Sequence, residues 1–542
     1  MSDWASAATA PKGGVAPATT RVANLAQHLT RNAARVGDRL ALVFGDLRLS
    51  WAELDARVSA LAAGLRDVHG VTKGDRILVQ SQNCNQMFEV MLACFRLGAV
   101  YVPANFRQTA DEVAWLAQSS GAVGMICGAE FPDHATACAT ETRRFVLTIG
   151  GDDTHNDLDA LIAAHSGAHV PNAAVDRDDP CWFFFTSGTT GRPKASVLTH
   201  GQMAFVLVNH LNDLMPGTGP DDRSLCVAPL SHGAGVHQMA QVAAGAATVL
   251  YPPGRFDPAV AWKIVQDEHI TNMFTVPTIV KMLTEHESVA QFDHSSLRYV
   301  IYAGAPMYRA DQKVALRVLG KVLVQYFGLG EVTGNITVLP PAEHSEDDAQ
   351  MRVGSCGYPR TGVEISIQAP DGAALPAGQT GEICVCGPAV FAGYYDNPQA
   401  NAKAFRDGWF RTGDLGYVDD AGYLFITGRE SDMYISGGSN IYPREIEEKI
   451  LTHEAISEVA VLGVPDLTWG EVGVAVCVLR DGGTVAPDDL LAWLKPKIAG
   501  YKMPKRAIFL PDMPKSAYGK ITKKLIRQTL EERGLLEVPA EA

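Results

Sequence analysis

The sequence predicts an α/β fold with a large N-terminal domain, built on parallel α/β sheets, and a smaller α+β C-terminal domain. Short apolar runs alternate with helical patterns early in the chain, and the alternation resumes from Ser224 to about Met307. Repeated strand–helix–strand units give mostly parallel sheets with helices on both faces. After Gly428-Arg429 a new helix, two strands and another helix follow, which indicates a separate unit.

The first units show the alternation most clearly. Ser50 and Glu53 have the spacing of a capping box, and the apolar residues after them recur at helical spacing. The apolar run at residues 77–79 predicts a buried strand. A second helix is expected to end at Gly98, before a strand at residues 100–102.

Later segments complete the predicted organisation. From Gly354 to Thr427, short apolar stretches broken by Gly, Pro and Asp predict a small antiparallel, barrel-like part of the large domain. The expected divisions are a disordered segment at 1–19, the large domain at 20–429 and the small domain at 430–542. Further strands are expected at residues 225–228, 247–251, 272–276, 299–302, 459–464 and 474–479, and further helices at 443–452 and 487–499.

Composition and charge disfavour several classes of protein. The net charge of −14 argues against binding to a nucleic-acid backbone, which needs many Lys and Arg contacts. Residues 1–19 lack the basic start and the apolar core of a signal peptide. The longest near-continuous apolar run, residues 242–251, is about half of the roughly 20 residues that a membrane helix needs. We therefore expect a cytoplasmic protein without integral membrane association; the sequence indicates no oligomeric state.

The ten cysteines are scattered along the chain, and none of them forms a CxxC pair. This spacing disfavours a zinc site and an imposed disulfide framework. Reduced thiols inside the core are the expected state.

The most specific stretch is Phe-Phe-Phe-Thr-Ser-Gly-Thr-Thr-Gly-Arg-Pro-Lys at residues 183–194. A buried strand leads into a loop of glycines and hydroxyls, in which backbone N–H groups, hydroxyls and a lysine can converge on phosphate oxygens. The spacing differs from GxxxxGK[ST], which disfavours a Walker-type kinase, and a flexible surface loop is the other interpretation. The candidate phosphate-binding residues are Thr186, Ser187, Gly188, Thr189, Thr190, Gly191 and Lys194.

This stretch resembles the phosphate-binding loop of the adenylate-forming superfamily, which includes acyl-CoA synthetases, firefly-type luciferases and peptide-synthetase adenylation domains. Further short motifs follow in the family's order from about Leu25 to Leu530. The resemblance implies a two-domain fold with a mobile C-terminal domain. It also implies ATP, Mg²⁺ and coenzyme A as cofactor and co-substrates.

Three motifs carry the nucleotide part of the resemblance. Residues 327–331, Phe-Gly-Leu-Gly-Glu, are similar to the family's Tyr-Gly-x-Thr-Glu, so Phe327 would stack on adenine and Glu331 would hold Mg²⁺ against the phosphates. Asp414, in Thr-Gly-Asp-Leu-Gly, would accept from both ribose hydroxyls, and Arg429 would reach the nucleotide. The remaining implied ATP- or AMP-binding residues are Gly304, Ala305, Pro306, Gly328 and Gly330.

Two positions depart from the family pattern. Gly330 replaces a threonine whose hydroxyl contacts the α-phosphate, and it also enlarges the space beside the acyl carboxylate; a plain turn glycine is the alternative. A threonine there could restore the hydrogen bond. Ser431 stands at the hinge, where Asp or Lys is usual. Beyond it, Gly437 and Gly438 lie in a loop that would enter the site after domain rotation and border the pantetheine tunnel.

Lys520, in Pro-Lys-Ser-Ala-Tyr-Gly-Lys-Ile, is the implied catalytic lysine. It would bridge the attacking carboxylate and the α-phosphate and stabilise charge at phosphorus. Residues 495–528 hold ten Lys or Arg and a single acid, so a solvated basic face is the alternative for most of them. His232 resembles a gate of the acyl pocket, which Leu329 and Gly330 would also line. His200 and His237 receive no role.

The resemblance implies a carboxylic acid–CoA ligase that forms an acyl-adenylate and pyrophosphate, then a thioester and AMP. Small residues suggest room for a medium-to-long chain or an aromatic ring, and no arginine is evident that must pair with a second carboxylate. The alternatives are an adenylate-forming enzyme with another acceptor, or a ligase of short-chain or dicarboxylic acids. The small residues are Gly233, Ala234, Gly235, Gly330 and Gly334.

Overall fold

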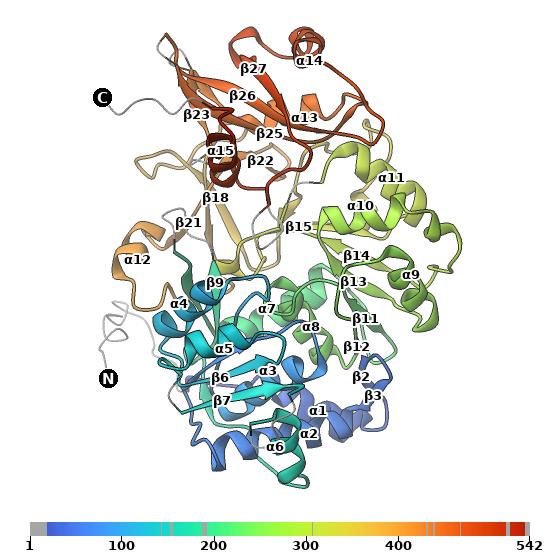
Figure 1. Cartoon of the computed structure of the whole chain (residues 1–542), viewed down its shortest axis with the longest axis vertical. Coiled ribbons are helices and arrows are strands. Elements are labelled where there is room, and N and C mark those ends of the chain that lie inside the picture. Colours follow the sequence, from blue (N-terminus) through green and yellow to red (C-terminus); the bar gives the residue numbers. More distant parts are fainter. Residues whose placement is uncertain are drawn as a thin grey trace.

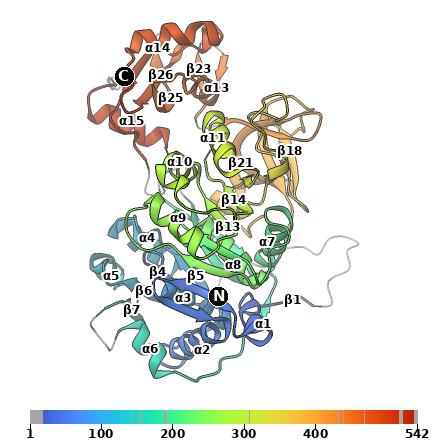
Figure 2. The same ribbon diagram turned by 90° about the vertical axis from the view of Figure 1, so that its right-hand side faces the viewer.

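The computed structural model describes residues 19–142, 144–151, 156–186, 192–305, 307–429, 432–436, 439–466, 468–515 and 521–536. Elements from the first half of the chain fill the lower part of Figure 1, and the C-terminal elements, orange to red, lie together at the top there and in Figure 2. Within the described residues, no helix has both the length and the apolar character needed to cross a membrane. All ten cysteines are free and nine are buried, as predicted.

One sheet of the large N-terminal part has six strands in the order β10-β9-β5-β4-β6-β7. Neighbouring strands are parallel except for β9 and β10, which are antiparallel. Residues 77–79 are buried in β4, as predicted for a strand with helices on both faces. The strands are β4 (Arg76–Gln80), β5 (Val100–Pro103), β6 (Gly124–Gly128), β7 (Phe145–Ile149), β9 (Pro180–Thr186) and β10 (Lys194–Thr199).

The other sheet has nine strands in the order β17-β16-β15-β14-β13-β11-β12-β2-β3. The strands from β15 to β2 are parallel, and antiparallel strands close both edges. The four strands expected between residues 225 and 302 are present as β11 to β14. The strands are β2 (Leu40–Phe44), β3 (Leu47–Ser50), β11 (Arg223–Cys226), β12 (Ala247–Leu250), β13 (Asn272–Thr275), β14 (Tyr299–Tyr302), β15 (Leu323–Phe327), β16 (Thr337–Leu339) and β17 (Tyr358–Pro359).

The main apolar core lies between these two sheets and includes residues of α2, α3, α7 and α8. The Ser50 side chain accepts from the Glu53 N–H, and the Glu53 carboxylate accepts from the Ser50 N–H, which confirms the predicted capping box. Gly98, with φ 68°, ends α3 as predicted. These helices, with the shorter ones packed beside them, are α1 (Gln27–Val36), α2 (Trp51–Asp67), α3 (Asn85–Leu97), α6 (Leu158–Ala164), α7 (His200–Asp213) and α8 (Gly233–Ala244).

Other helices cover the outer faces of the sheets. On the six-stranded sheet these are α4 (Ala110–Ser120) and α5 (Pro132–Cys138). On the nine-stranded sheet they are α9 (Pro258–Asp267), α10 (Pro277–Glu285) and α11 (Arg309–Leu319). The result is a layered arrangement in which α7 and α8 contribute to the core between the two sheets.

An antiparallel sheet follows, as the change of pattern after Gly354 predicted. It lies beside the carboxyl end of β9, because Ala392 and Tyr395 hydrogen-bond along β10. Its strands are β18 (Glu364–Gln368), β19 (Gly381–Cys386), β20 (Phe405–Arg406), β21 (Trp409–Val418) and β22 (Leu424–Arg429), with α12 (Pro398–Ala404) between β19 and β20. A short pair joins β1 (Arg21–Val22) to β8 (Val175–Asp176).

The C-terminal part has a separate sheet whose order is β24-β23-β26-β25, with β27 beside β26. The helix expected at 487–499 ends at Leu494 and gives way to a 3-10 turn at Lys495–Lys497, because Pro496 cannot continue the hydrogen-bond ladder. The elements are β23 (Tyr434–Ser436), β24 (Ser439–Ile441), α13 (Pro443–Ile450), β25 (Ile456–Asp466), β26 (Gly470–Leu479), α14 (Pro487–Leu494), β27 (Arg506–Phe509) and α15 (Lys523–Glu532). The predicted boundary at 429/430 falls beside residues outside those described and stays a prediction.

Candidate active site

The candidate residues gather at the carboxyl ends of the parallel strands. Thr186 is the last residue of β9, Phe327 is the last of β15, and Gly304 follows β14. In α/β sheets this edge is where ligands usually bind. Gly304 and Ala305 are exposed, and Gly304 has φ 82°, a conformation that favours glycine. A flat ligand could therefore approach the backbone closely at this point.

Glu331 is the centre of a hydrogen-bonded cluster. Its side chain is almost completely buried, at 6% exposure. The Thr186 hydroxyl donates to Glu331 Oε1 at 2.8 Å, and the Tyr394 hydroxyl donates to the same oxygen at 2.9 Å. Lys194 Nζ lies 4.7 Å from the centre of the Tyr394 ring. Tyr394 therefore contacts both Glu331 and Lys194, the first residue of β10. Thr186, the last residue of β9, donates to the same Glu331 oxygen.

Sequence analysis missed Tyr394. The segment before it adds to the edge of β10: Ala392 N–H donates to Val197 O, and Val197 N–H donates to Gly393 O, both at 3.0 Å. Burial and the neighbouring Glu331 charge raise the pKa of Tyr394, so its hydroxyl stays protonated and donates. The local sequence around Tyr394, Gly-Tyr-Tyr, does not indicate that this tyrosine contacts Glu331, which is distant in the chain.

The chemistry of this cluster fits a magnesium ion. Both hydrogen bonds to Glu331 reach Oε1, and within the described part of the chain none reaches Oε2. Mg²⁺ prefers one or two carboxylate oxygens and takes its other ligands from phosphates and water. Glu331 Oε2, on a carboxylate held in place by the two donors on Oε1, has the chemistry that such a ligand requires.

Asp414 and Arg429 face each other across β21 and β22. Their Cα atoms are register partners, and Arg429 Nε donates to Asp414 Oδ1 at 2.9 Å. The Asp414 charge is the largest influence that raises the pKa of Arg429, and the Asp432 and Glu331 charges add to it while burial opposes them. Arg429 therefore lies near enough to Glu331 for the carboxylate charge to act on the guanidinium. The sequence did not show this proximity.

Gly330 does not leave an empty space beside this cluster. A Cβ atom built there would lie 2.7 Å from Cδ1 and Cε1 of Phe184 and 2.8 Å from Cγ2 of Thr186. The Phe184 ring meets the His232 ring edge-on, with centroids 5.5 Å apart. The enlarged space expected from the missing threonine is therefore filled by a phenylalanine. Leu329 is half-buried and packs against the main core.

The other small residues also accommodate protein side chains. A Cβ at Gly235 would lie 2.7 Å from Trp182, one at Gly334 would lie 2.5 Å from Tyr326, and one at Gly233 would lie 2.9 Å from Phe274. At Gly235 the backbone oxygen of Leu230 would be closer still, at 2.1 Å. A side chain at any of these positions would strike other parts of the protein, so these glycines are no measure of the room for an acyl chain.

The two unassigned histidines are core residues. His200, at the start of α7, and His237, in α8, are completely buried. Burial lowers the pKa of each to about 4. They are therefore neutral at physiological pH.

Several predicted positions lie outside the described residues. They belong to the phosphate loop, the end of the adenine segment, the hinge, the glycine loop and the catalytic loop. They are Ser187, Gly188, Thr189, Thr190, Gly191, Pro306, Ser431, Gly437, Gly438 and Lys520.

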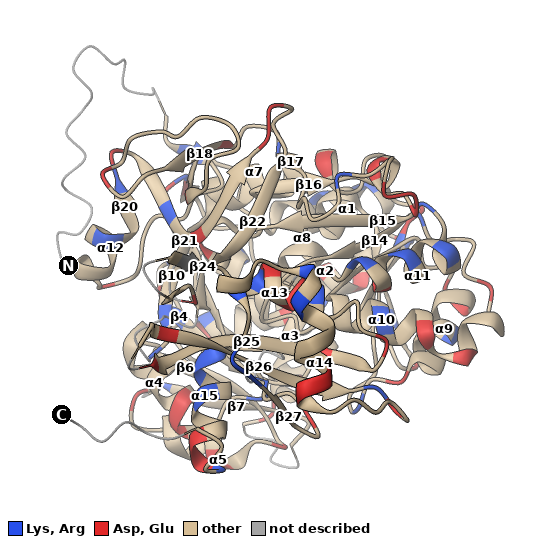
Figure 3. Cartoon of the chain, turned by 90° about the horizontal axis from the view of Figure 1, so that it is seen from above, with Lys and Arg blue, Asp and Glu red and all other residues tan. Residues whose placement is uncertain are grey.

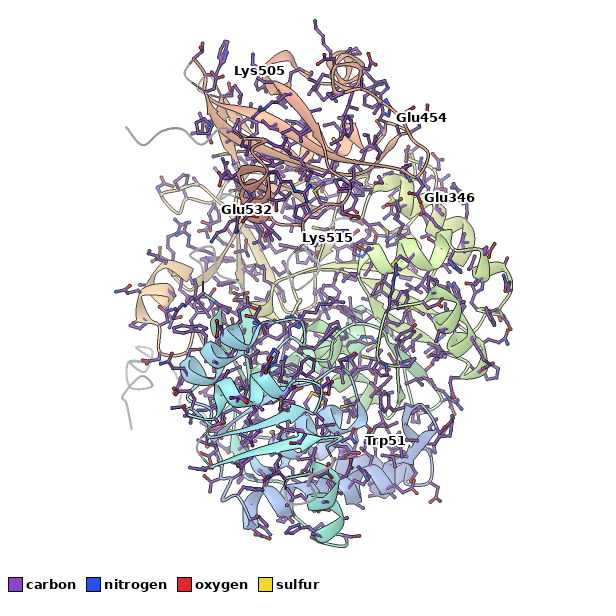
Figure 4. The ribbon with its side chains drawn as sticks, viewed as in Figure 1. Trp51, Glu346, Glu454, Lys505, Lys515 and Glu532 are labelled. Atoms are coloured by element: carbon purple, nitrogen blue, oxygen red, sulfur yellow. The ribbon has the colours of Figure 1, made fainter. Side chains whose placement is uncertain are left out.

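The ends of these segments are nevertheless placed. Lys515, shortly before Lys520, lies where the C-terminal elements meet the rest of the chain (Figure 4). Tyr308, just before α11, packs against the apolar core of the C-terminal sheet. Some lysines of the basic C-terminal stretch form ion pairs: Lys502 with Glu445, Lys515 with Glu458 and Lys523 with Glu447. Both acidic and basic residues lie on α13 (Figure 3).

Comparisons with known proteins agree with this architecture. Residues 29–395 match the sequence profile of the AMP-binding enzymes, and residues 445–520 match the profile of the AMP-binding enzyme C-terminal domain. The chain belongs to the AMP-binding enzyme family. This AMP-binding enzyme falls in the acyl-CoA synthetase branch of the adenylate-forming superfamily and is an AMP-forming acid–CoA ligase.

Relatives match nearly the whole enzyme. It is 38% identical to a feruloyl-CoA synthase from Amycolatopsis sp, over 90% of this chain and 95% of that protein. It is 34% identical to an indoleacetate–CoA ligase from Aromatoleum aromaticum, over 95% of this chain and 99% of that protein. Among solved structures, it resembles an o-succinylbenzoate CoA synthetase from Bacillus subtilis in complex with its acyl-adenylate. The TM-score is 0.81 and the sequences are 30% identical, over 94% of this chain and 98% of that chain.

Proposed function

We propose that this AMP-binding enzyme joins an aromatic carboxylic acid to coenzyme A through an acyl-adenylate, and that the Glu331 cluster assembles the first half-reaction. The observation that carries the proposal is the pair of hydrogen bonds from Thr186 and Tyr394 to Glu331, at the edge where β9 and β15 end. A buried carboxylate held by two donors is fixed in position before substrate arrives, which lowers the cost of reorganisation.

The residues around this cluster receive distinct roles. Glu331 would hold Mg²⁺, which when bound neutralises the phosphates of ATP. Thr186, the Ser187–Gly191 loop and Lys194 would bind the phosphates. Asp414 would accept from the ribose hydroxyls, held in orientation by Arg429. The adenine would lie between Phe327 and the backbone at Gly304 and Ala305, which is open enough for a ring to approach.

Lys520 and the hinge belong to the same proposal. Lys520 would stabilise the negative charge that develops when the carboxylate attacks the α-phosphate. The C-terminal part would then turn about Ser431, so that the loop with Gly437 and Gly438 could border the thiol. Two different transition states in one cavity require two arrangements of groups, which is the physical reason for such a motion.

An aromatic acyl group is favoured over a long chain by two observations. Two relatives that match over most of their length are named for feruloyl and indoleacetate groups. Around the first turn of α8, beside His232, the enzyme's own side chains are aromatic: Phe184, Phe274 and Tyr326. Flat aromatic neighbours pack well against an aromatic substrate.

A panel of acids tests this proposal. The enzyme with ATP, Mg²⁺ and coenzyme A should release AMP in proportion to thioester, with arylpropenoic and arylacetic acids ahead of saturated acids of equal carbon number. Lys520→Ala should slow adenylate formation by about 10²–10³-fold, while thioester formation from supplied acyl-adenylate changes much less. A preference for saturated long-chain acids would refute the aromatic assignment, and equal loss in both half-reactions would refute the role of Lys520.

A further inference from the structure

Arg360 is a buried arginine whose hydrogen-bonding capacity is largely unused. It follows β17, and 1% of its surface is exposed. Its Nη1 reaches Gly334 O only at 3.5 Å, and its Nε lies 3.8 Å from Asp213 Oδ2. Within the described residues, Nε and Nη2 have no hydrogen-bond partner. Such a buried guanidinium is costly unless another group completes its pairing.

Asp213 does not fill this gap. Its Oδ2 already accepts from the Thr361 N–H at 2.8 Å, and its Oδ1 accepts from the Thr361 hydroxyl at 2.9 Å. It also accepts from the Asn209 side chain at 3.1 Å. Burial lowers the pKa of Arg360 to about 10, so the group remains charged at neutral pH.

Apart from Asp213 at the end of α7, the groups that surround Arg360 come from α7, α8 and β15 and are polar but neutral. Its Cζ lies 5.9 Å from the centre of the Tyr326 ring. The Tyr326 ring meets His210 edge-on, and His210 Nε2 lies 3.2 Å from His237 Nδ1. Burial holds the pKa of both histidines well below the usual range. His210 Nδ1 also has no partner in the described structure. The cluster therefore offers one positive charge and several unused hydrogen-bonding atoms.

This cluster adjoins the acyl side of the active site. His232 immediately precedes α8, whose first residue is Gly233. A Cβ at Gly233 would lie 2.9 Å from Phe274 Cζ and 3.4 Å from the Tyr326 hydroxyl. Arg360 lies against the same Tyr326 ring. An acyl group that extended from His232 along the start of α8 would approach Phe274 and Tyr326, and Arg360 lies beside that same tyrosine.

We propose that Arg360 is a specificity residue that receives an acceptor oxygen carried at the far end of the acyl group. A ring hydroxyl or methoxy oxygen and a second carboxylate share this chemistry. The inference rests on the proposed function and adds to it, because it names the substituent that the aromatic acid carries. No arginine that must pair with a second carboxylate is evident from the sequence, and this proposal names Arg360 as a candidate.

Three acids with the same cinnamic skeleton and different para substituents separate these sources: cinnamic acid, 4-hydroxycinnamic acid and 4-carboxycinnamic acid. The measurement is kcat and KM for acid-dependent AMP release by the wild-type enzyme and by Arg360→Met. Methionine has a similar length and no charge. Because removing one partner of a buried ion pair is destabilising, the comparison is made between acids within each variant. Arg96→Met is the matched control, because Arg96 is equally buried but pairs with Asp55 on α2.

The wild-type enzyme should prefer an oxygen-bearing acid to cinnamic acid. Arg360→Met should lower kcat/KM for the preferred acid by about tenfold or more, the scale of a hydrogen bond to a charged group, mainly through KM. Cinnamic acid should change by less than about threefold, and Arg96→Met should leave the ratio between acids unaltered. The acid whose kcat/KM falls most in Arg360→Met shows whether the oxygen comes from a ring hydroxyl or from a second carboxylate.

Two results would overturn the inference. One is a wild-type enzyme that uses cinnamic acid as well as both oxygen-bearing acids. The other is an equal loss for all three acids in Arg360→Met, which would assign Arg360 to the Asp213 ion pair alone. Both differ from failure of the proposed function, in which no aromatic acid of the panel would support AMP release.

Discussion

Adding one methyl group at Gly330 perturbs the active site in a way that the structure quantifies. The Cβ of Gly330→Ala would lie 2.7 Å from two ring carbons of Phe184 and 2.8 Å from Cγ2 of Thr186. Ordinary carbon contacts are about 3.5–4.0 Å, so the ring must move by roughly 0.8 Å or more. It is enclosed by Trp182 and His232, with ring centroids at 6.2 and 5.5 Å.

Such overpacking costs about 1–3 kcal/mol. If the strain falls on the reactive arrangement, kcat/KM drops by about 5- to 150-fold, at about 1.4 kcal/mol per tenfold. Gly330→Thr adds the same clash, which outweighs the roughly 0.5–1.5 kcal/mol of a restored phosphate hydrogen bond. We therefore expect both variants to lose acid-dependent pyrophosphate exchange. This is the opposite of the higher activity expected if the threonine only restored a phosphate hydrogen bond.

Phe184→Leu provides the control, because it removes the ring that the new methyl would strike. The double variant Gly330→Ala/Phe184→Leu should recover activity relative to Gly330→Ala, with a coupling energy of about 1 kcal/mol or more in the double-mutant cycle. Pyrophosphate exchange and the melting temperature are measured for all four proteins. Additive effects of the two substitutions would refute the contact between Gly330 and Phe184.

Three further outcomes follow from the site. Tyr394→Phe removes one donor to Glu331 and should lower adenylate formation by about tenfold and raise the Mg²⁺ concentration needed for half-maximal rate; an unchanged Mg²⁺ titration would contradict the cluster. Ser431→Pro should retain acid-dependent pyrophosphate exchange but lose most thioester formation, since proline fixes φ at the hinge; wild-type thioester turnover would dismiss the pivot. Burial lowers the pKa of His237 to about 4, so below about pH 6.5 the unfolded chain binds a proton that the folded chain does not. The free energy of unfolding should fall on acidification by up to about 1.4 kcal/mol per pH unit for this residue, and urea unfolding of His237→Asn should show a shallower slope.

Local signals predicted much of the fold. The capping box of Ser50 and Glu53 and the left-handed Gly98 mark helix ends through contacts within a few residues, and these ends are where they were expected. The strand before the phosphate loop was equally clear, because its apolar run is continuous. Each of these features depends on residues that are neighbours in the sequence.

Long-range contacts could not be predicted in the same way. Tyr394 reaches Glu331 only because its segment pairs with β10, and Arg360 reaches Tyr326 only through the folding of β15 to β17. Likewise, the sequence shows that Gly330 has no side chain but not that Phe184 occupies the space. These residues are placed by packing between distant segments, which no local pattern records.

The fate of the carboxylate oxygen tests the acyl-adenylate most directly. The enzyme is supplied with ATP, coenzyme A and an aromatic acid labelled with ¹⁸O in its carboxyl group, and the products are analysed by mass spectrometry. Attack of the carboxylate on the α-phosphate leaves one labelled oxygen in AMP when the thioester forms. We expect AMP that carries one ¹⁸O and pyrophosphate that carries none. Release of ADP, or label in phosphate with unlabelled AMP, would contradict the account.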